Sequence, residues 1–347
     1  MRIPFAGMAL SIMLLATAVS GCAAAQPTAP TAPTPPKPPM PAVALVVEPQ
    51  AGYQPVYDFI AGARTSLDMT MYQLADTKAQ DALKAAAKRG VKVRVLLDSD
   101  TQSGGNSTMN QAAYSDLTTS GVEVRWAWSG TLWHQKSISR DGAAAAIMTC
   151  NLYAPYYPVV RDFAVITNNR ATVAGMEATF DKDWQATSSP PTSGVAPSGS
   201  DLVWSPGAQA PLVGLIDSAR SGTTIWAEDE QLDSQQIQQA LVSAAKRGVA
   251  VNFLMTYSSD WASGLATLSS GGVHVRVYQP NAPIYIHAKA LTVNDDTAYV
   301  GSANFTTAMT DQNRNVGIIT KDTPVVRGIR STIASDFAGA APLAPSQ

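Results

Sequence analysis

The sequence predicts an α/β protein of two similar halves, each an α/β/α sandwich in which a β-sheet lies between layers of helices. Two observations support this prediction. The hexapeptide AAKRGV occurs at residues 86–91 and again at residues 244–249, each time at the end of a helical pattern. A β-rich run follows each copy, VKVRVLLD in the first case and VAVNFLMT in the second. Strands that alternate with helices are typical of α/β folds with a mostly parallel or mixed sheet, and the recurrence indicates an internal repeat.

The two helical patterns that end in this hexapeptide are equivalent. AQDALKAAAKRG and IQQALVSAAKRG both carry small and apolar residues at helical spacing. Each stops at a glycine, Gly90 or Gly248, which suits the left-handed conformation that ends many helices. Further strands, SGVEVRW and GGVHVRV, follow at matching places.

A single offset of 153 residues then relates the polar landmarks of the two halves. The pairs are His134 and His287, Lys136 and Lys289, Asn151 and Asn304, Asp162 and Asn315, Asp183 and Asp336, and Trp184 and Phe337. Chance does not keep one offset across so many positions. We therefore expect residues 46–187 and 201–338 to be two copies of one unit.

The N-terminus has the pattern of a secretory signal. Arg2 precedes an apolar run that is too short for a comfortable membrane span, and small residues lead up to Cys22. The ending VSGC resembles the bacterial lipobox, which implies removal of residues 1–21 and acylation of the Cys22 thiol. We therefore expect a lipid-anchored, extracytoplasmic protein of the cell membrane or envelope. Ordinary signal cleavage, with Cys22 incidental, is the alternative.

Three segments lie outside the two repeats. Residues 22–45 are rich in Ala, Thr and Pro, which favours an extended tether behind the anchor. Residues 188–200 form a Pro/Ser/Gly-rich linker, and residues 339–347 a flexible tail. If Cys22 is acylated, Cys150 is the only remaining thiol, and we expect it to be a small buried hydrophobic residue.

The histidines indicate where the chemistry lies. The chain has three, and two of them, His134 and His287, occupy equivalent positions with a lysine two residues later. Side chains at i and i+2 of a strand point to the same face, so each His–Lys pair projects together. Metal binding is the competing interpretation, but a lysine beside each histidine would repel a cation. We therefore expect neither a metal nor another cofactor.

The doubled pattern H-x-K-x4-D, followed by G-S-x-N, resembles the phospholipase D superfamily. The first copy consists of His134, Lys136 and Asp141 with Thr149 and Asn151, and the second of His287, Lys289 and Asn294 with Gly301, Ser302 and Asn304. The segments RGVKVRVLLD and FDKDW also look like family landmarks, and the resemblance covers nearly all of residues 46–338. It implies a phospholipase D-like fold whose halves are related by a pseudo-twofold axis, with the active site at their interface.

The resemblance also implies roles for these residues. One neutral imidazole would attack phosphorus to form a phosphohistidine, while the other, as imidazolium, would protonate the leaving alcohol. Lysine and asparagine side chains would stabilise the phosphate oxygens. The catalytic set is expected to be His134, His287, Lys136, Lys289 and Asp162; the phosphate-binding set Asn151, Asn304, Ser302 and Thr149; and the supporting set Asp141, Asn294 and Asn315.

Two details of the motifs affect this assignment. Asp162 and Asn315 each follow their histidine by 28 residues, and family members commonly carry an acid here that bonds the motif histidine. A carboxylate raises the basicity of an imidazole, so we expect His134 to be the nucleophile and His287 the general acid. The departures from the family pattern, Asn294 for Asp, and Met148 and Thr149 for Gly and Ser, are expected to tune activity.

The substrate is the least constrained part of the interpretation. We expect hydrolysis of the head-group phosphodiester of phospholipids, with transphosphatidylation as a second outcome. Aromatic residues crowd both motifs, which suits a lipid interface. A nuclease is the alternative, but the formal net charge of −2 makes nucleic acid a poor partner. A phospholipid synthase and a non-catalytic phosphate-binding surface module complete the candidates, and we expect a monomer.

Overall fold

The computed structural model describes residues 43–99 and 107–344. The expected signal, Cys22 and the tether up to residue 42 lie outside these ranges. The first half contains β1 (Val43–Glu48), α1 (Gln54–Ala61), β2 (Ser66–Met71), α2 (Thr77–Lys88), β3 (Lys92–Leu97), α3 (Ser107–Thr119), β4 (Glu123–Trp126), β5 (Lys136–Arg140), β6 (Ala144–Met148), the 3-10 turn η1 (Ala154–Tyr156), β7 (Val160–Thr167) and α4 (Arg170–Gln185).

The second half repeats this order of elements. It contains β8 (Leu202–Ser205), α5 (Gln209–Asp217), β9 (Thr224–Glu228), α6 (Gln235–Lys246), β10 (Ala250–Thr256), η2 (Ser259–Trp261), α7 (Ala262–Ser270), β11 (His274–Tyr278), β12 (Tyr285–Ile286), β13 (Ala290–Val293), β14 (Thr297–Gly301), α8 (Thr307–Asp311), β15 (Asn315–Thr320), α9 (Thr323–Gly339) and β16 (Ala341–Pro342). The linker at residues 188–200 contains neither helix nor strand.

The two sheets have the same strand order, which confirms the repeat predicted from the sequence. The first runs β1-β7-β6-β5-β2-β3-β4 and the second β8-β15-β14-β13-β9-β10-β11. In each sheet three strands are parallel and the other four join them antiparallel, so both sheets are mixed. The second sheet gains β16 beside β11, and β12 of the second half joins β7 of the first.

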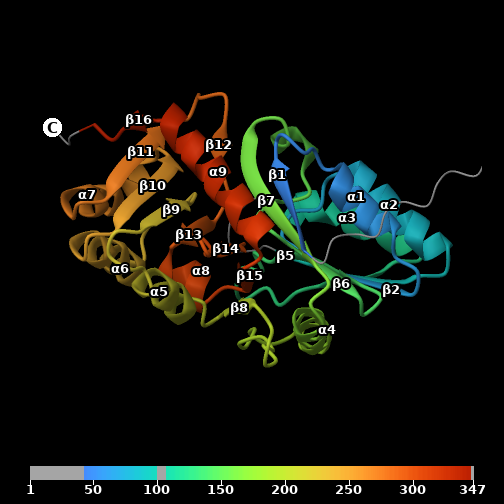
Figure 1. The fold of residues 1–347 in the computed structure, drawn as a ribbon. Coiled ribbons are helices and arrows are strands. Elements are labelled where there is room, and N and C mark those ends of the chain that lie inside the picture. Colours follow the sequence, from blue (N-terminus) through green and yellow to red (C-terminus); the bar gives the residue numbers. More distant parts are fainter. Residues whose placement is uncertain (1–42, 100–106, 345–347) are drawn as a thin grey trace, which may run out of the picture. The chain divides into compact units, whose positions relative to one another are not determined.

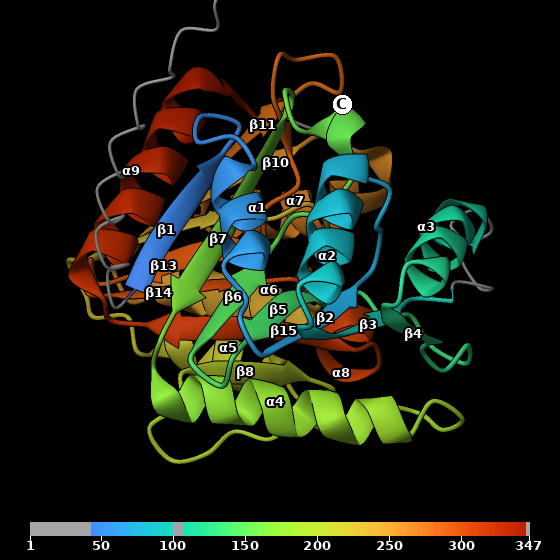
Figure 2. The ribbon, with the colours of Figure 1, turned by 90° about the vertical axis from the view of Figure 1, so that its right-hand side faces the viewer.

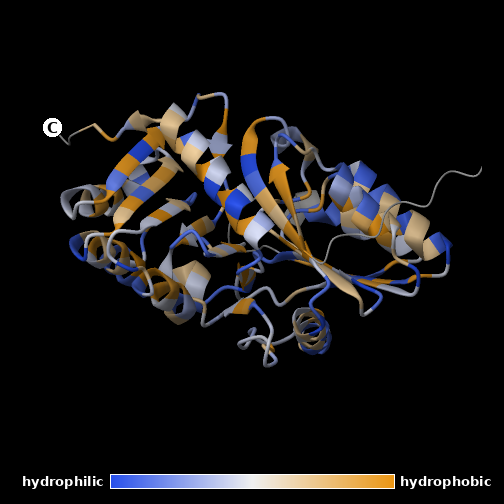
Figure 3. Ribbon diagram, in the orientation of Figure 1, coloured by the Kyte–Doolittle hydropathy of each residue, from blue (hydrophilic) through white to orange (hydrophobic). Residues whose placement is uncertain are grey.

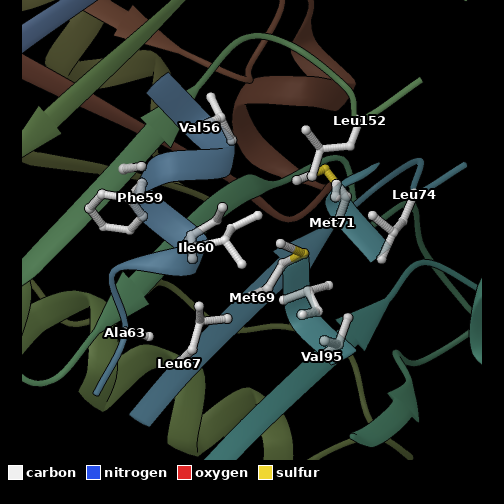
Figure 4. Close-up of a cluster of buried hydrophobic side chains, with 14 of the residues drawn as sticks. Val56, Phe59, Ile60, Ala63, Leu67, Met69, Met71, Leu74, Val95 and Leu152 are labelled. Carbon is white, nitrogen blue, oxygen red and sulfur yellow. The ribbon is translucent and has the colours of Figure 1, made fainter. Parts of the chain in front are cut away.

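Helices cover the outer face of each sheet. Figure 1 shows α1–α3 and α5–α7 at opposite ends of the described part, with α4 and α9 between them, and Figure 2 shows α1 and α2 side by side over the first sheet. In Figure 3 these outer helices alternate between hydrophilic and hydrophobic residues. Figure 4 shows the apolar face of α1, with Val56, Phe59 and Ile60, packed on Leu67 and Met69 of β2.

The inner faces of the two sheets share one core. Ile147 of β6 and Val165 of β7 lie in the same buried cluster as Val300 of β14 and Val316 of β15, and α4 and α9 contribute apolar residues to it. Burial of apolar surface between the halves stabilises their association. This core therefore fixes the ends of β5, β7, β13 and β15, from which the candidate site is built.

Some expected boundaries were wrong by a few residues. β1 begins at Val43 rather than after residue 45, because Val43, Ala44 and Leu45 pair with β7. The expected flexible tail starts with the last residue of α9, Gly339, and continues into β16, since Ala341 and Pro342 pair with β11 and Leu343 packs on the second core. Gly90 and Gly248 end their helices at φ +87° and +86°, as predicted.

No helix among residues 43–99 and 107–344 is long and apolar enough to cross a lipid bilayer.

Candidate active site

Backbone pairing between the halves brings the two histidine segments to one place. Trp133 pairs with Arg314 of the second half in a parallel bridge, immediately before His134. The equivalent pairing joins Ile286 of β12 to Arg161 of β7, immediately before His287; β12 lies beside β7 in Figure 1. Both imidazoles line a single cavity of about 610 Å³. The structure thus places the predicted histidines at the interface between the halves.

Each histidine is oriented by a residue of the opposite half. Nδ1 of His287 lies 2.8 Å from Oδ1 of Asp162. Nδ1 of His134 lies 3.0 Å from the carbonyl oxygen of Ser302 and 3.2 Å from Oδ1 of Asn315. These partners are acceptors, so we assign the proton of both neutral rings to Nδ1. The other nitrogen, Nε2, then carries the lone pair that is available for chemistry.

This crossed pairing corrects the expectation that Asp162 bonds His134. Each histidine pairs in space with the strand of the other half, because Trp133 lies against Arg314 and Ile286 against Arg161. The equal spacing of 28 residues within each half carries no information about that exchange. Asp162 therefore supports His287.

The hydroxyls of Thr149 and Ser302, which were expected to bind phosphate, have protein partners in the structure. Thr149 Oγ1 donates to Oδ1 of Asp162, and Ser302 Oγ donates to Oδ1 of Asn315 over 3.0 Å. Both side chains are fully buried, and neither is among the residues that line the cavity. Each hydroxyl instead fixes the side chain that orients the opposite histidine. The Thr149 departure preserves this hydrogen bond.

Asn151 and Asn304 have buried polar atoms without a hydrogen-bond partner in the described part of the chain. Asn151 lines the cavity, and within the described part of the chain its buried Oδ1 has no hydrogen-bond partner. Neither Oδ1 nor Nδ2 of Asn304 has one among these residues. Buried polar groups are almost always paired in folded proteins. The free donor Nδ2 of Asn304 suits a ligand oxygen such as that of phosphate, although Asn304 does not itself line the cavity, whereas the free Oδ1 of Asn151 suits a ligand that donates a hydrogen bond.

Both lysines are fully buried beside their histidines. Lys136 Nζ donates to the carbonyl oxygen of His134 over 2.7 Å and lies 4.8 Å from the ring centre of Tyr72. Lys289 Nζ donates to the carbonyl oxygen of His287 and to Oε2 of Glu230, the latter over 3.0 Å. Burial and the charge of Lys289 hold the pKa of Lys136 well below its usual value. A bound anion would relieve this repulsion.

The environment of His134 favours its neutral form. Burial, followed by the charges of Lys136 and Lys289, lowers the pKa of His134 well below 6.5. His287, by contrast, faces two carboxylates: Asp162 at Nδ1, and Oε2 of Glu230 3.7 Å from Nε2. The two rings therefore differ in environment: His134 lies beside buried lysines, whereas His287 lies between two carboxylates.

Tyr72 and Glu230 are site residues that were missed. Tyr72 lies against both His134 and Lys136, with ring centres 4.8 Å apart in the first contact, and Glu230 contacts His287 and Lys289. The two residues are equivalent in the repeat, in the segments MYQL and DEQL, whose Gln-Leu endings match at an offset of 158. This match between the repeats is the feature of the sequence that could have identified both residues.

The third residue of each H-x-K-x4-D motif is remote from the cavity. Oδ1 of Asp141 accepts from the backbone amides of residues 64–66, and Oδ1 of Asn294 accepts from the Arg220 amide and from Oγ1 of Thr223. Both residues have φ +57° in the turn between two strands, a region that Asp and Asn tolerate best. The Asn294 departure therefore preserves a turn and leaves the cavity unchanged.

Met148 departs from the family glycine for a packing reason. Met148 is fully buried in the core of the first half. At the equivalent Gly301, an added Cβ would lie 2.4 Å from the hydroxyl of Tyr299 and 2.6 Å from Cα of Gly317. Tyr299 corresponds to Ala146 in the first half. The first half thus places its large side chain at Met148, and the second half places its own at Tyr299.

Two buried ion pairs tie the halves together beside the site. Arg161 Nε lies 2.5 Å from Oδ2 of Asp336, and Arg314 Nη2 lies 2.5 Å from Oδ1 of Asp183. The arginines immediately precede Asp162 and Asn315. The two aspartates belong to the predicted repeat landmarks, but their partners were not predicted. Each pair anchors the strand that supplies an orienting side chain to the opposite half.

Cys150 is buried, as expected from the sequence, and the third histidine, His274, lies away from the cavity. Cys150 is buried in the first core, and burial raises the pKa of its thiol well above the usual value. His274 is exposed on β11. Among residues 43–99 and 107–344, no group of three or more His, Cys, Asp or Glu side chains could hold a metal ion.

Similarity to known proteins covers both halves. The family described as "Cardiolipin synthase, PLD-like domain" matches residues 56–184 and 212–337. The probable cardiolipin synthase YwiE of Bacillus subtilis is 28% identical over 130 residues, which is 37% of this chain and 26% of that protein. The major cardiolipin synthase ClsA of Bacillus subtilis is 23% identical over 340 residues, covering 85% of this chain and 69% of its own length.

The fold also resembles a solved structure. The crystal structure of phosphatidylserine synthase from Haemophilus influenzae Rd KW20 superimposes with a TM-score of 0.67 and 9% sequence identity, covering 87% of both chains. At this identity the likeness concerns the fold alone. It agrees with the two-halved architecture described above.

Proposed function

Because the chain belongs to the phospholipase D superfamily, we propose that it transfers the phosphatidyl group of a phospholipid to an alcohol or to water. The observation that carries this proposal is the pair of imidazoles, His134 and His287, which come from opposite halves and line one cavity together with Asn151. Relatives that match most of the chain's length are named as cardiolipin synthases. Their names favour transfer to an alcohol over the hydrolysis expected from the sequence.

His134 is the nucleophile in the proposed first step. Its neutral Nε2 attacks phosphorus, the phosphorus–oxygen bond to the leaving alcohol breaks, and a phosphohistidine forms. His287, protonated and flanked by Asp162 and Glu230, donates the proton to the departing oxygen. The expected roles are retained, but the reason is replaced: the carboxylate stabilises the acid His287 instead of activating the nucleophile.

The second step reverses these roles. An alcohol or a water molecule loses its proton to Nε2 of His287 while its oxygen bonds to phosphorus, and the bond from phosphorus to His134 breaks. The buried side chains of Lys136, Lys289, Asn151 and Asn304 donate to the charged phosphate oxygens in this step. Of these donors, Nδ2 of Asn304 has no hydrogen-bond partner among the described residues.

The mouth of the cavity favours a lipid over nucleic acid. Tyr156, Val159 and Tyr285 line the cavity and are 47%, 46% and 37% exposed. Apolar and aromatic side chains at an opening suit the interface between lipid head groups and acyl chains. A groove that follows a polyanionic strand is normally lined by cations. The remaining aromatic residues near the motifs include Trp133, which is buried and fills the protein interior.

The full-length protein with phospholipid vesicles tests the proposed function. Vesicles of phosphatidylglycerol and of phosphatidylcholine are incubated with glycerol, and both free phosphatidic acid and transfer products are quantified, with plasmid DNA as a parallel substrate. We expect lipid turnover that is lost in His134→Ala. Phosphorus label trapped in His287→Ala should map to His134. Cleavage of DNA without lipid turnover, or turnover of neither substrate, would refute the proposal.

We propose that an acyl anchor at Cys22 holds the catalytic halves close to a phospholipid surface on the extracytoplasmic side. The motif VSGC and the Pro-rich segment that follows it support this proposal. Each buried acyl methylene contributes roughly 0.8 kcal/mol, so several chains anchor a protein firmly. Metabolic labelling with a radioactive fatty acid should label the wild-type protein, whereas Cys22→Ala should carry no label and should leave the membrane fraction. Label retained in that variant would contradict the anchor.

A further inference from the structure

The carboxylate of Glu230 breaks the symmetry of an otherwise symmetric site. The repeat places Tyr72 at the equivalent position, and each of the two residues contacts the histidine and the lysine of its own half. One wall of the cavity is therefore aromatic, whereas the opposite wall carries a negative charge. A phosphate-binding site gains nothing from a carboxylate as such, because the charges repel.

The position of Glu230 associates it with the alcohol instead of the phosphate. Its Oε2 lies 3.7 Å from Nε2 of His287, the nitrogen that exchanges a proton with the leaving or attacking oxygen in the proposed mechanism. An alcohol bound at this nitrogen must therefore lie beside the carboxylate. Glu230 lines the cavity, and its side chain remains 18% exposed toward it.

Glu230 is held in place and is ionised. Tyr285 donates to Oε1 over 3.1 Å and Lys289 donates to Oε2 over 3.0 Å. Burial opposes ionisation, but the charges of Lys289 and His287 overcome it and lower the pKa of Glu230 to about 2. A carboxylate offers about four acceptor positions, so these two hydrogen bonds leave capacity for another donor or for a cation.

We propose that Glu230 gives the alcohol side of the site a charge preference, favouring alcohols that carry a cationic group and disfavouring those that carry a second anion. This inference rests on the proposed roles of His134 and His287. The substrate class is then a phosphodiester of an amino alcohol, or an amino alcohol as acceptor. Diesters with neighbouring phosphates, such as nucleic acids, are disfavoured by the same charge.

A series of acceptors that differ in charge tests the proposal. The full-length protein is loaded with the synthetic diester bis(p-nitrophenyl) phosphate, and transfer to choline, to its neutral isostere 3,3-dimethylbutan-1-ol and to the anion isethionate is measured by mass spectrometry. In the transfer step the alcohol oxygen bonds to phosphorus, the bond from phosphorus to His134 breaks, and the hydroxyl proton passes to His287. For the wild type we expect transfer to choline to exceed transfer to isethionate by at least about tenfold, the factor that a 1.4 kcal/mol interaction produces.

Two variants remove the charge in different ways. Glu230→Gln keeps the shape and the acceptor oxygen, and Glu230→Tyr installs the residue that the repeat carries at Tyr72. Both should reduce the ratio of choline to isethionate transfer to within about threefold of unity, since only the Coulomb contribution distinguishes these acceptors. Glu123→Gln, the same change at an exposed strand position, should leave the ratio at its wild-type value.

The possible outcomes separate this inference from the proposed function. A wild-type preference that persists in both variants, or an equal loss of transfer to all three acceptors, would show that Glu230 is merely structural. A charge preference that disappears in the variants, together with no turnover of phospholipid vesicles, would retain the inference and refute the lipid substrate. Failure of the wild type to turn over any diester would refute both.

Discussion

Replacing Asp162 with Asn tests the crossed pairing of the histidines with their orienting side chains. The variant keeps an acceptor oxygen for Nδ1 of His287 and for the hydroxyl of Thr149, as Asn315 already provides for His134 and Ser302. The local structure should therefore survive. The variant removes only the negative charge beside His287. In the proposed mechanism, His287 must carry a proton to act as the general acid.

The size of the effect follows from the geometry. The carboxylate oxygen lies 2.8 Å from Nδ1 of His287, and a hydrogen bond to a charged acceptor contributes about 1 kcal/mol more than one to a neutral acceptor. A general acid matters most when the leaving oxygen is a poor leaving group, because that oxygen then needs the proton. For a diester of an alkyl alcohol we therefore expect kcat/KM to fall by about fivefold in Asp162→Asn, whereas bis(p-nitrophenyl) phosphate, whose leaving group needs no proton, should show little change.

The ratio of kcat/KM for the two diesters measures this effect. The nucleophile should be unaffected, because burial and the two lysines lower the pKa of His134 and no variant group touches it. Asp81→Asn, the same change on the exposed side of α2, should leave kcat/KM for both diesters at the wild-type value. If Asp162→Asn slowed both diesters equally, the carboxylate would act on the nucleophile His134 and the crossed pairing would be refuted.

Three further predictions concern stability. Arg314→Met leaves the buried Asp183 unpaired and should lower the free energy of unfolding by about 3–5 kcal/mol in urea titrations. Arg330→Met breaks an exposed ion pair and should lower it by less than about 1 kcal/mol. Equal losses in the two variants would contradict the argument from burial. Burial and Asp162 raise the pKa of Glu48 from near 4.5 to about 7, so the folded protein binds the extra proton and stability falls as pH rises through this window. Glu48→Gln should accordingly raise the free energy of unfolding by roughly 3 kcal/mol at pH 8 and leave it unchanged at pH 4. A difference that does not depend on pH would contradict this prediction. Asp141→Asn should lower the free energy of unfolding by about 1 kcal/mol and leave kcat unchanged. A large loss of kcat would show that this turn belongs to the active site.

The repeat made most of the fold predictable from the sequence. Matching helices and β-rich runs at a nearly constant offset led to two equal halves, and the sheets do share one strand order. The tail could not be predicted in the same way, because β16 has no counterpart in the first half and depends on pairing with β11. The start of β1 at Val43 was hidden by the adjoining Pro-rich composition.

The sequence identified two histidines that the structure brings to one cavity, but not how their side chains are paired. His134 and His287 stood out by their spacing from a lysine, and both line the cavity. The exchange of partners between Asp162 and Asn315 depends on which strands meet across the interface, and spacing along one chain does not encode that. Glu230 was overlooked because it belongs to no motif and is recognised only by its mismatch with the residue at the same place in the other half.

The crossed network explains why the two halves must act as one unit. Each half supplies a histidine whose ring is oriented by the other half: Asp162 holds His287, and Asn315 holds His134. A separated half would therefore lose the second imidazole and also the hydrogen bond that fixes the proton of its own. Because Asp162 and Asn315 differ in charge, a duplicated scaffold gives His287 a charged acceptor and His134 a neutral one. A displacement at phosphorus needs a neutral nucleophile and a protonated acid at the same moment. In the proposed mechanism this exchange of a carboxylate for an amide, together with Glu230 beside His287, is what makes the two imidazoles different.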